Sequence, residues 1–311
     1  MPVTDVPPPP TLQHRLEYIA IRGMVALLKL IPFYSASDFG GMLGRLAYRT
    51  GIRARVAEAQ IRFAFPEFSD EDVRRIACES YDNLGRTSIE AAMMEKCQRQ
   101  AMIDLFESID GWEHVDAALA QGRGALLVTG HLGNWEVGGA CIAANGTQVD
   151  AVARHMSNRL FEKYLTEVRE QNGLRVIFDD QAVRQIPRSL RENRIVGSLV
   201  DQGVAGLASS FVPFFGRLAK TPRGPAVFMQ RLNVPMVFAV AVRQASRKYR
   251  LIIEPVAPVE TGDREADITA VVATFTARLE YWVRQYPGQY FWQHRRWKYQ
   301  PDGAPPLPDG M

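Results

Sequence analysis

Beyond about residue 100 the sequence alternates between short apolar runs and amphipathic segments, and this alternation constrains the fold more than any other feature. Short apolar runs bounded by turn residues are typical of buried strands, and the segments between them have helical apolar spacing. Strands that alternate with helices build a sheet with helices on its faces. The predicted strands are Ala125–Thr129, Val149–Ala153, Arg175–Phe178, Ile195–Val200, Phe211–Phe214, Met236–Val242 and Tyr249–Ile253. The predicted helices are Gly111–Gln121, Asn134–Ala144, Asn158–Gln171, Gln181–Glu192, Pro222–Leu232 and Glu265–Gln285.

The part of the chain before this alternation predicts helices only. Residues 36–97 contain successive helical patterns, and Ser69 begins a capping box. No flexible linker separates these helices from the α/β part, so residues 34–311 are predicted as one domain, helical over 34–100 and α/β over 101–300. We predict an α/β fold with a central mixed sheet flanked by helices, preceded by an N-terminal helical region that associates with a membrane. Residues 1–10 end in four prolines and predict a disordered leader.

Residues 11–33 predict one amphipathic helix. Its cations Arg15, Arg22 and Lys29 recur every seven residues, which is about two helical turns, so they share one narrow face. Burying Arg22 or Lys29 at the centre of a bilayer would cost about 2.5–3.5 kcal/mol each, which disfavours a spanning helix. Lys29 also interrupts the apolar core that a signal peptide needs. The prediction is an interfacial helix with its basic stripe on lipid phosphates; the alternative is a helix packed on the protein's own core.

Composition excludes several functional classes. The chain has 37 Lys and Arg against 34 Asp and Glu, with no block of like charge, so no nucleic-acid partner is predicted. The cysteines Cys78, Cys97 and Cys141 form no CxxC, and HExxH is missing, so neither a disulfide framework nor a metal site is predicted. Patterns typical of serine hydrolases, phosphate-binding loops and dinucleotide folds (GxSxG, GxxxxGK[ST], GxGxxG) are also missing.

The segment Gly130–Glu136 is the best candidate for chemistry. It follows the predicted strand Ala125–Thr129 and precedes a helix, so His131 would lie where α/β sheets bind ligands. Asn134 can cap that helix and place Glu136 in its first turn, where the helix dipole favours a negative charge. An ionised Glu136 within reach of the imidazole would make it a stronger base. This pattern favours His131 and Glu136 as catalytic residues, and the alternative is a buried structural histidine.

Three further segments are candidates for contacts with substrate. Asp201 follows a predicted strand and would lie on the same edge of the sheet as His131. An acid there is either a functional contact or a cap of the loop. Lys220–Pro225 begins a helix with Arg223 beside it, which suits an anion or phosphate as well as ordinary capping. The tail Phe291–Lys298 interleaves aromatic and basic residues, a mixture found at membrane interfaces and in RNA-binding proteins.

Taken together, these stretches resemble the bacterial lipid A (lauroyl/myristoyl) acyltransferase family, within the glycerolipid acyltransferase superfamily. The resemblance rests on Gly130–Glu136, Ala153-Arg154, Asp201-Gln202, Val212–Gly216 with Thr221, and His294–Lys298. It implies transfer of an acyl chain from a thioester of acyl carrier protein or coenzyme A to a hydroxyl of a glycolipid, at the cytoplasmic face of the inner membrane. It implies no cofactor and no covalent intermediate.

The resemblance also assigns roles to individual residues. His131 is the expected general base with Glu136 as its partner, and Arg154, Asp201, Thr221 and Arg223 are the expected substrate-binding residues. Family members often have Tyr-Arg-Pro around the arginine, whereas this chain has Ala153-Arg154-His155. The stretch Pro222–Ala226 looks like that of the related phosphatidylinositol mannoside acyltransferases. The acceptor therefore stays open between a lipid A precursor and another lipid such as a phosphatidylinositol mannoside or an aminolipid. A non-catalytic membrane-binding module is the third hypothesis.

Overall fold

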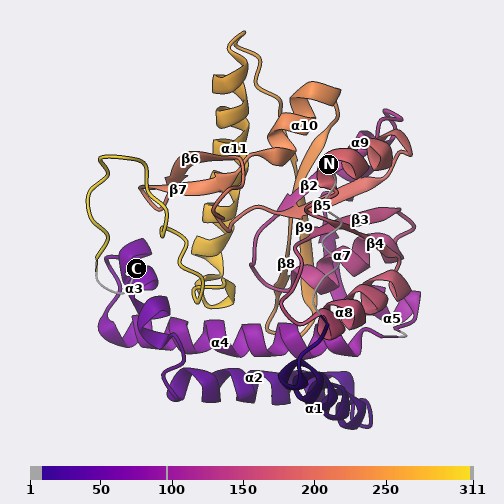
Figure 1. The fold of residues 1–311 in the computed structure, drawn as a ribbon, viewed down its shortest axis with the longest axis vertical. Helices are drawn as coiled ribbons and strands as arrows, with labels where there is room; N and C mark the ends of the chain where they lie inside the picture. The colour runs from indigo at the N-terminus through magenta and orange to yellow at the C-terminus, as the bar shows by residue number, and fades with distance from the viewer. Residues whose placement is uncertain (1–8, 96, 309–311) are drawn as a thin grey trace.

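A mixed sheet is the centre of the protein in a computed structural model that describes residues 9–95 and 97–308. Five neighbouring strands are parallel, β9 is antiparallel to β8, and β1 is parallel to β9. The predicted α/β fold with a mixed sheet is confirmed (Figure 1). The order across the sheet is β1 (Phe106–Asp110), β9 (Tyr249–Val256), β8 (Met236–Arg243), β2 (Ala125–Thr129), β5 (Ile195–Leu199), β3 (Val149–Ala153) and β4 (Leu174–Phe178).

Helices cover both faces of this sheet. In β2, Leu126 and Val128 belong to one apolar core, and Ala125 and Leu127 to the other, because successive side chains of a strand point to opposite faces. Burial on both faces explains why the strand is a continuous apolar run. The first core is covered by α9 (Ala182–Arg191), α10 (Gly224–Leu232) and α11 (Arg264–Gln285). The second core is covered by α6 (Trp112–Leu119), α7 (Trp135–Ala144) and α8 (Arg159–Gln171).

One predicted strand lies outside the central sheet. The apolar run Phe211–Phe214 belongs to β6 (Ser209–Phe214), which pairs only with β7 (Arg217–Pro222) in an antiparallel ribbon. The strands β1 and β7 were not predicted, because both are short and carry charged residues within their runs. The helix predicted from Pro222 begins at Gly224, since β7 continues to Pro222.

The N-terminal part is helical, as predicted, and its longest helix crosses one edge of the sheet. Its elements are α1 (Leu12–Leu28), α2 (Phe33–Arg49), α3 (Ala54–Ala64), α4 (Asp70–Met93) and α5 (Arg99–Asp104). The 24 residues of α4 span about 36 Å, and they pass beneath the strands in Figure 1, with α2 below them. The two helices are in close contact, because a Cβ on Gly44 would lie 1.9 Å from the carbonyl oxygen of Tyr81.

The orientation of α1 differs from the prediction. The Arg22 guanidinium lies 4.3 Å from the centre of the Tyr164 ring, and Arg22 and Lys29 both form ion pairs with Glu95. Two of the three cations of the predicted lipid-binding stripe thus face the protein itself. The apolar residues face outward instead, with Leu12 73% and Leu27 69% exposed. Arg22 and Lys29 therefore do not form the free basic face that was predicted, while contact of the helix with lipid stays a prediction.

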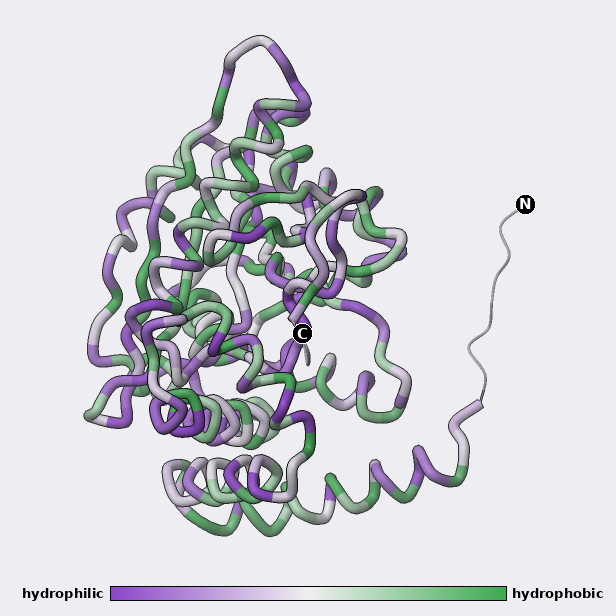
Figure 2. Tube along the Cα trace, turned by 90° about the vertical axis from the view of Figure 1, so that its left-hand side faces the viewer, coloured by the Kyte–Doolittle hydropathy of each residue, from purple (hydrophilic) through white to green (hydrophobic). Residues whose placement is uncertain are grey.

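The outward apolar surface extends from α1 onto α2. Its members, which we call the α1–α2 apolar surface, are Leu12, Leu16, Ile19, Leu27, Leu30, Ile31, Met42 and Leu46. Hydrophobic residues recur along the outer edge of these two helices in Figure 2. Among the described residues, no helix combines the length and the hydropathy needed to cross a bilayer. Of the predicted leader, residues 1–8 lie outside the described part of the chain.

Candidate active site

His131, Asp201 and Arg154 follow the carboxyl ends of three adjacent strands. These residues follow β2, β5 and β3, which are neighbours in the sheet and parallel to one another. Parallel neighbouring strands end at the same edge, so the three residues lie on one rim although they are far apart in sequence. This placement is the predicted one for all three.

His131 and Asp201 form a hydrogen-bonded pair on this rim. The Nδ1 atom of His131 lies 2.7 Å from Oδ1 of Asp201, and the backbone N–H of His131 donates to Oδ2 of the same carboxylate at 2.9 Å. The Asp201 side chain is only 2% exposed, whereas the imidazole is 19% exposed. One buried carboxylate therefore fixes both the backbone and the ring of His131.

Electrostatics keep Asp201 ionised and define the tautomer of His131. Burial alone would raise the pKa of Asp201, but the charge and hydrogen bonds of His131 outweigh burial, and Arg296 contributes further, so the pKa falls to about 2. An ionised carboxylate only accepts hydrogen bonds, so the proton of the neutral imidazole is on Nδ1. The Nε2 atom then carries a lone pair, as a general base requires.

Two aromatic rings and one amide surround the imidazole. The Trp135 ring meets it edge to face at a centroid distance of 4.7 Å, and the Phe291 ring lies at 5.7 Å. The Gln202 amide nitrogen is 3.3 Å from Nδ1 and 3.4 Å from Nε2. With these groups around it the imidazole keeps 19% of its surface exposed, which is the part that a substrate hydroxyl could approach.

The predicted pairing of Glu136 with the imidazole needs correction. Glu136 lies in the first turn of α7, as predicted. Its carboxylate accepts two hydrogen bonds from Arg169 of α8, at 2.9 and 2.6 Å, and one from the Trp135 indole at 3.2 Å. Burial raises the pKa of Glu136, but Arg169 outweighs burial and lowers it below the usual range, with a smaller effect of His131. Asp201 takes the partner position because β5 lies directly beside β2. No sequence signal distinguishes Arg169 from the other cations of its helix.

The loop between β2 and α7 requires glycine at position 133. Gly133 has a φ of +66°, and a Cβ there would lie 1.9 Å from the carbonyl oxygen of Ala241 in β8. The next residue, Asn134, is buried and caps α7, because its Oδ1 accepts from the backbone N–H of Val137 at 3.1 Å. The capping role of Asn134 is as predicted, and the close approach explains why the loop cannot shift freely.

The predicted substrate-binding residues have different surroundings. Arg154 is 63% exposed and pairs with Asp179 at 3.2 Å. Thr221 in β7 is 1% exposed, and its hydroxyl accepts from Arg296 at 2.6 Å. Arg223 precedes α10 and pairs with Glu265 at 2.6 Å. Arg154 alone of these three presents most of its side chain to solvent.

The aromatic and basic tail is largely a buried element. Trp292, Trp297 and Arg296 are each at most 2% exposed. Arg296 donates to the carbonyl oxygen of Lys220 and to Thr221, both at 2.6 Å, and its charge helps to hold the pKa of Asp201 low. The tail therefore forms a wall beside the His131–Asp201 pair, and these buried residues are not available to RNA or to a membrane.

A mainly apolar cavity lies between α7 and the sheet, and Thr129 and Trp135, on either side of the His131 loop, line part of it. Its volume is about 80 Å³, and small residues form much of its wall, among them Gly138, Gly197 and Ala239. Trp135 lines the cavity and also contacts the imidazole of His131. Glu136 and Arg169 also border the cavity. The described residues contain no cluster of His, Cys, Asp and Glu that could hold a metal ion.

Comparison with known proteins relates almost the whole chain to one family. Residues 10–299 match the family described as bacterial lipid A biosynthesis acyltransferase. The chain is 26% identical over 296 residues to the lipid A biosynthesis lauroyltransferase of Escherichia coli (strain K12), covering 94% of each protein. It is 26% identical to the lipid A biosynthesis palmitoleoyltransferase of the same organism, covering 92% of each. It is 22% identical to the phosphatidylinositol mannoside acyltransferase of Mycolicibacterium smegmatis, covering 87% of this chain and 88% of the relative.

Proposed function

The chain belongs to the bacterial lipid A biosynthesis acyltransferase family, and from this premise we propose that it moves a fatty acyl chain from an acyl thioester to a hydroxyl of a glycolipid. The observation that carries the proposal is the 2.7 Å contact between Nδ1 of His131 and the buried Asp201 carboxylate. This contact leaves the Nε2 lone pair free of Asp201, and Trp135, which contacts the imidazole, also lines an apolar cavity.

The proposed reaction needs one base and no covalent intermediate. His131 Nε2 takes the proton of the acceptor hydroxyl while the hydroxyl oxygen attacks the carbonyl carbon of the thioester. The new ester C–O bond forms, the C–S bond breaks, and the proton passes from the imidazolium to the departing thiolate. Asp201 stabilises the imidazolium through its negative charge and keeps the ring in the required tautomer.

The thioester is a co-substrate, carried by acyl carrier protein or coenzyme A, and the chemistry as proposed uses no cofactor. The apolar cavity beneath α7 would receive part of the acyl chain. Its volume of about 80 Å³ equals roughly two or three water-sized groups, so a long chain would need α7 or Trp135 to move. Glu136 and Arg169 would then act at the border of this cavity, holding Trp135 between the acyl chain and the base.

A membrane location is the second part of the proposal. The α1–α2 apolar surface is exposed and lies on the same side of the sheet as α4, which crosses the rim. Insertion of this surface into the cytoplasmic leaflet of the inner membrane would bring the rim close to lipid acceptors. The exposed Arg154 could then bind an acidic group of the acceptor.

The acceptor is proposed to be a lipid A precursor, because the relatives that cover most of this chain at 26% identity are lipid A biosynthesis enzymes. A phosphatidylinositol mannoside is the second candidate, supported by the relative in Mycolicibacterium smegmatis.

Mass spectrometry of the glycolipids from a deletion strain tests these assignments. We expect a lipid A-type species lacking one acyl chain, restored by the wild-type gene and not by His131→Ala. An acyl chain missing from a phosphatidylinositol mannoside would establish the second candidate instead. An unchanged glycolipid profile would contradict both and favour a non-catalytic membrane module.

A further inference from the structure

A row of polar residues on α4 is buried against the His131 loop. Ser80, Asn83, Thr87 and Glu90 are spaced by three, four and three residues, so they share one face of the helix. None is more than 6% exposed. Burying polar groups is unfavourable unless they are hydrogen-bonded, so the partners of this α4 polar stripe show what it does.

Two members of the stripe hold one carbonyl group of the loop. The Asn83 amide donates to the carbonyl oxygen of Gly133 at 2.9 Å, and the Thr87 hydroxyl donates to the same oxygen at 3.2 Å. The Asn83 amide also donates to the carbonyl oxygen of Gln289 at 3.1 Å. The stripe thus ties the loop that carries His131 to the segment that carries Phe291.

Those two segments also bind each other directly. The backbone N–H of Gly133 donates to Gln289 at 3.0 Å, and that of Phe291 donates to the carbonyl of His131 at 3.0 Å. Ser80 at the other end of the stripe donates to the carbonyl of Tyr290 at 2.5 Å. The loop that carries His131 and the segment that carries Phe291 are therefore both anchored on α4.

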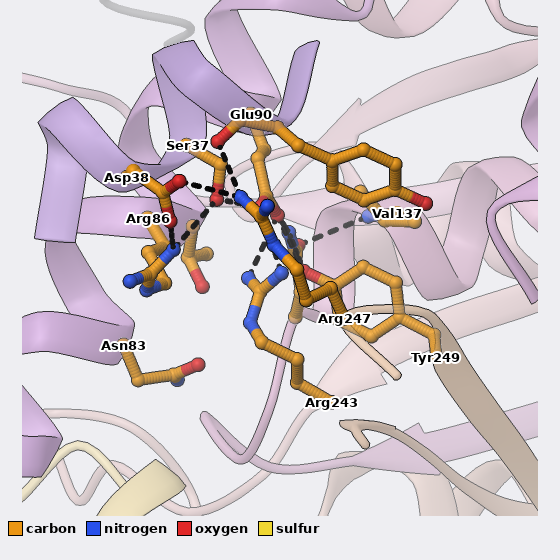
Figure 3. Close-up of polar contacts among 12 residues, drawn as sticks. Ser37, Asp38, Asn83, Arg86, Glu90, Val137, Arg243, Arg247 and Tyr249 are labelled. Carbon is orange, nitrogen blue, oxygen red and sulfur yellow. Dashed lines mark hydrogen bonds and ion pairs between the residues drawn. The ribbon is translucent and has the colours of Figure 1, made fainter. Parts of the chain in front are cut away.

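Glu90, drawn with Ser37, Arg243 and Tyr249 in Figure 3, extends the stripe to Asn134, the cap of α7. Its fully buried carboxylate accepts from the Asn134 amide at 2.7 Å and forms an ion pair with Arg243 at 2.9 Å. It also accepts from the hydroxyls of Ser37 in α2 and Tyr249 in β9. Glu90 holds the amide nitrogen of Asn134, and this orientation directs Oδ1 of Asn134 to the backbone N–H of Val137.

We propose that Asn83, Thr87 and Glu90 are positioning residues for His131. They act on Gly133 and Asn134, which join His131 to α7, while Asp201 fixes the other side of the histidine. The loop turns at Gly133, and glycine has more backbone freedom than any other residue, so external contacts are needed to keep one conformation. This inference rests on the proposed function in one respect, namely that His131 acts as a base.

Thr87→Val tests the stripe, because it keeps the side-chain shape and removes the donor to Gly133. We expect the backbone amides of residues 130–137 to exchange hydrogen at least about fivefold faster than in wild type, because one buried hydrogen bond is lost. We also expect kcat to fall by about tenfold while KM stays within about twofold. Thr87→Ser retains the hydroxyl, so its exchange rate in residues 130–137 and its kcat should both be close to those of wild type. Ser88→Ala, which removes a neighbouring exposed hydroxyl, is the matched control.

Glu90→Gln provides a second, independent variant, because the amide keeps the size of the carboxylate but not its charge. Faster exchange at the loop with the remainder of the sheet still protected supports the positioning role. Unchanged exchange in residues 130–137 in both variants, or activity lost only in proportion to unfolded protein, would overturn it. Hydrogen exchange needs no substrate, so failure of wild-type enzyme to transfer acyl groups would reject the proposed function and leave this test intact.

Discussion

The imidazole Nδ1 of His131 lies 2.7 Å from Oδ1 of Asp201, although 70 residues separate them in the sequence. Their pairing follows from the neighbouring positions of β2 and β5, whose carboxyl ends lie side by side. Glu136, only five positions from His131, instead pairs with Arg169. Proximity in sequence and proximity in space therefore identify different carboxylates.

Asp201→Asn should reduce kcat for acyl transfer by about 10²–10⁴-fold, because the amide cannot stabilise the imidazolium. His131→Ala should reduce it to a similar extent. Steady-state transfer from an acyl thioester, measured on folded protein, checks both. Asp302→Asn, an exposed acid near the C-terminus, is the control and should retain wild-type activity. Near-normal turnover of Asp201→Asn would show that the pair is structural.

Glu136→Gln should lower the free energy of unfolding by about 3–5 kcal/mol, because it leaves the Arg169 charge largely buried without a counter-charge. Adding Arg169→Met should recover part of the loss, since it removes the unpaired cation. Urea unfolding of the two single variants and the double variant measures this coupling. If Glu136→Gln abolishes activity at unchanged stability, Glu136 acts on the reaction directly.

Gly197→Val should fill the cavity beneath α7 and shorten the acyl chains that the enzyme accepts. The position is suitable because a Cβ on Gly197 finds its nearest neighbour at 3.8 Å, and β-branched residues are favoured in strands. Stability should therefore stay equal or rise. Competition between thioesters of different chain length measures the preference. The same preference in wild type and variant would place the acyl chain elsewhere.

Leu16→Ser with Leu27→Ser should weaken vesicle binding by about a hundredfold, since two exposed leucines that would insert into the bilayer contribute about 3 kcal/mol or more to binding. Binding should depend little on salt, because Arg22 and Lys29 are paired with Glu95. Co-sedimentation with anionic vesicles at low and high salt measures both effects. Val183→Ser on α9, at a residue that is 80% exposed, is the control. A double variant that binds like wild type would place the membrane surface elsewhere.

His294 should make stability depend on pH between about 4 and 6.5. The pKa of His294 is lowered to about 4, mainly by burial, with further lowering by the charges of protonated His131, Arg296 and Arg53 and an opposing effect of Asp201. The unfolded chain binds the proton more tightly, so stability is complete above pH 6.5 and declines as pH falls toward 4. His294→Gln should flatten this part of the curve. Chemical unfolding across that range measures the slope, and an unaltered slope would contradict the assignment.

Much of the fold could be predicted from sequence because its determinants are local. The apolar run Ala125–Thr129 predicted β2 with the bounds that the structure has, and the pattern from Asn134 predicted α7 with its cap. Burial on both faces makes such strands continuously apolar, so they stand out from the helices between them. The charged strands β1 and β7 lack that pattern and were missed.

The chain's local pattern determined which segments would form strands and helices, and it placed His131, Asp201 and Arg154 at strand ends. Only the tertiary structure decided which side chains meet there. The strand order makes Asp201 the partner of His131. Packing of the N-terminal helix against Glu95 and Tyr164 turns Arg22 and Lys29 inward and leaves Leu12, Leu16 and Leu27 exposed. Hydrogen bonds and ion pairs form across short distances in space, and those distances depend on how distant elements pack, which local periodicity does not encode.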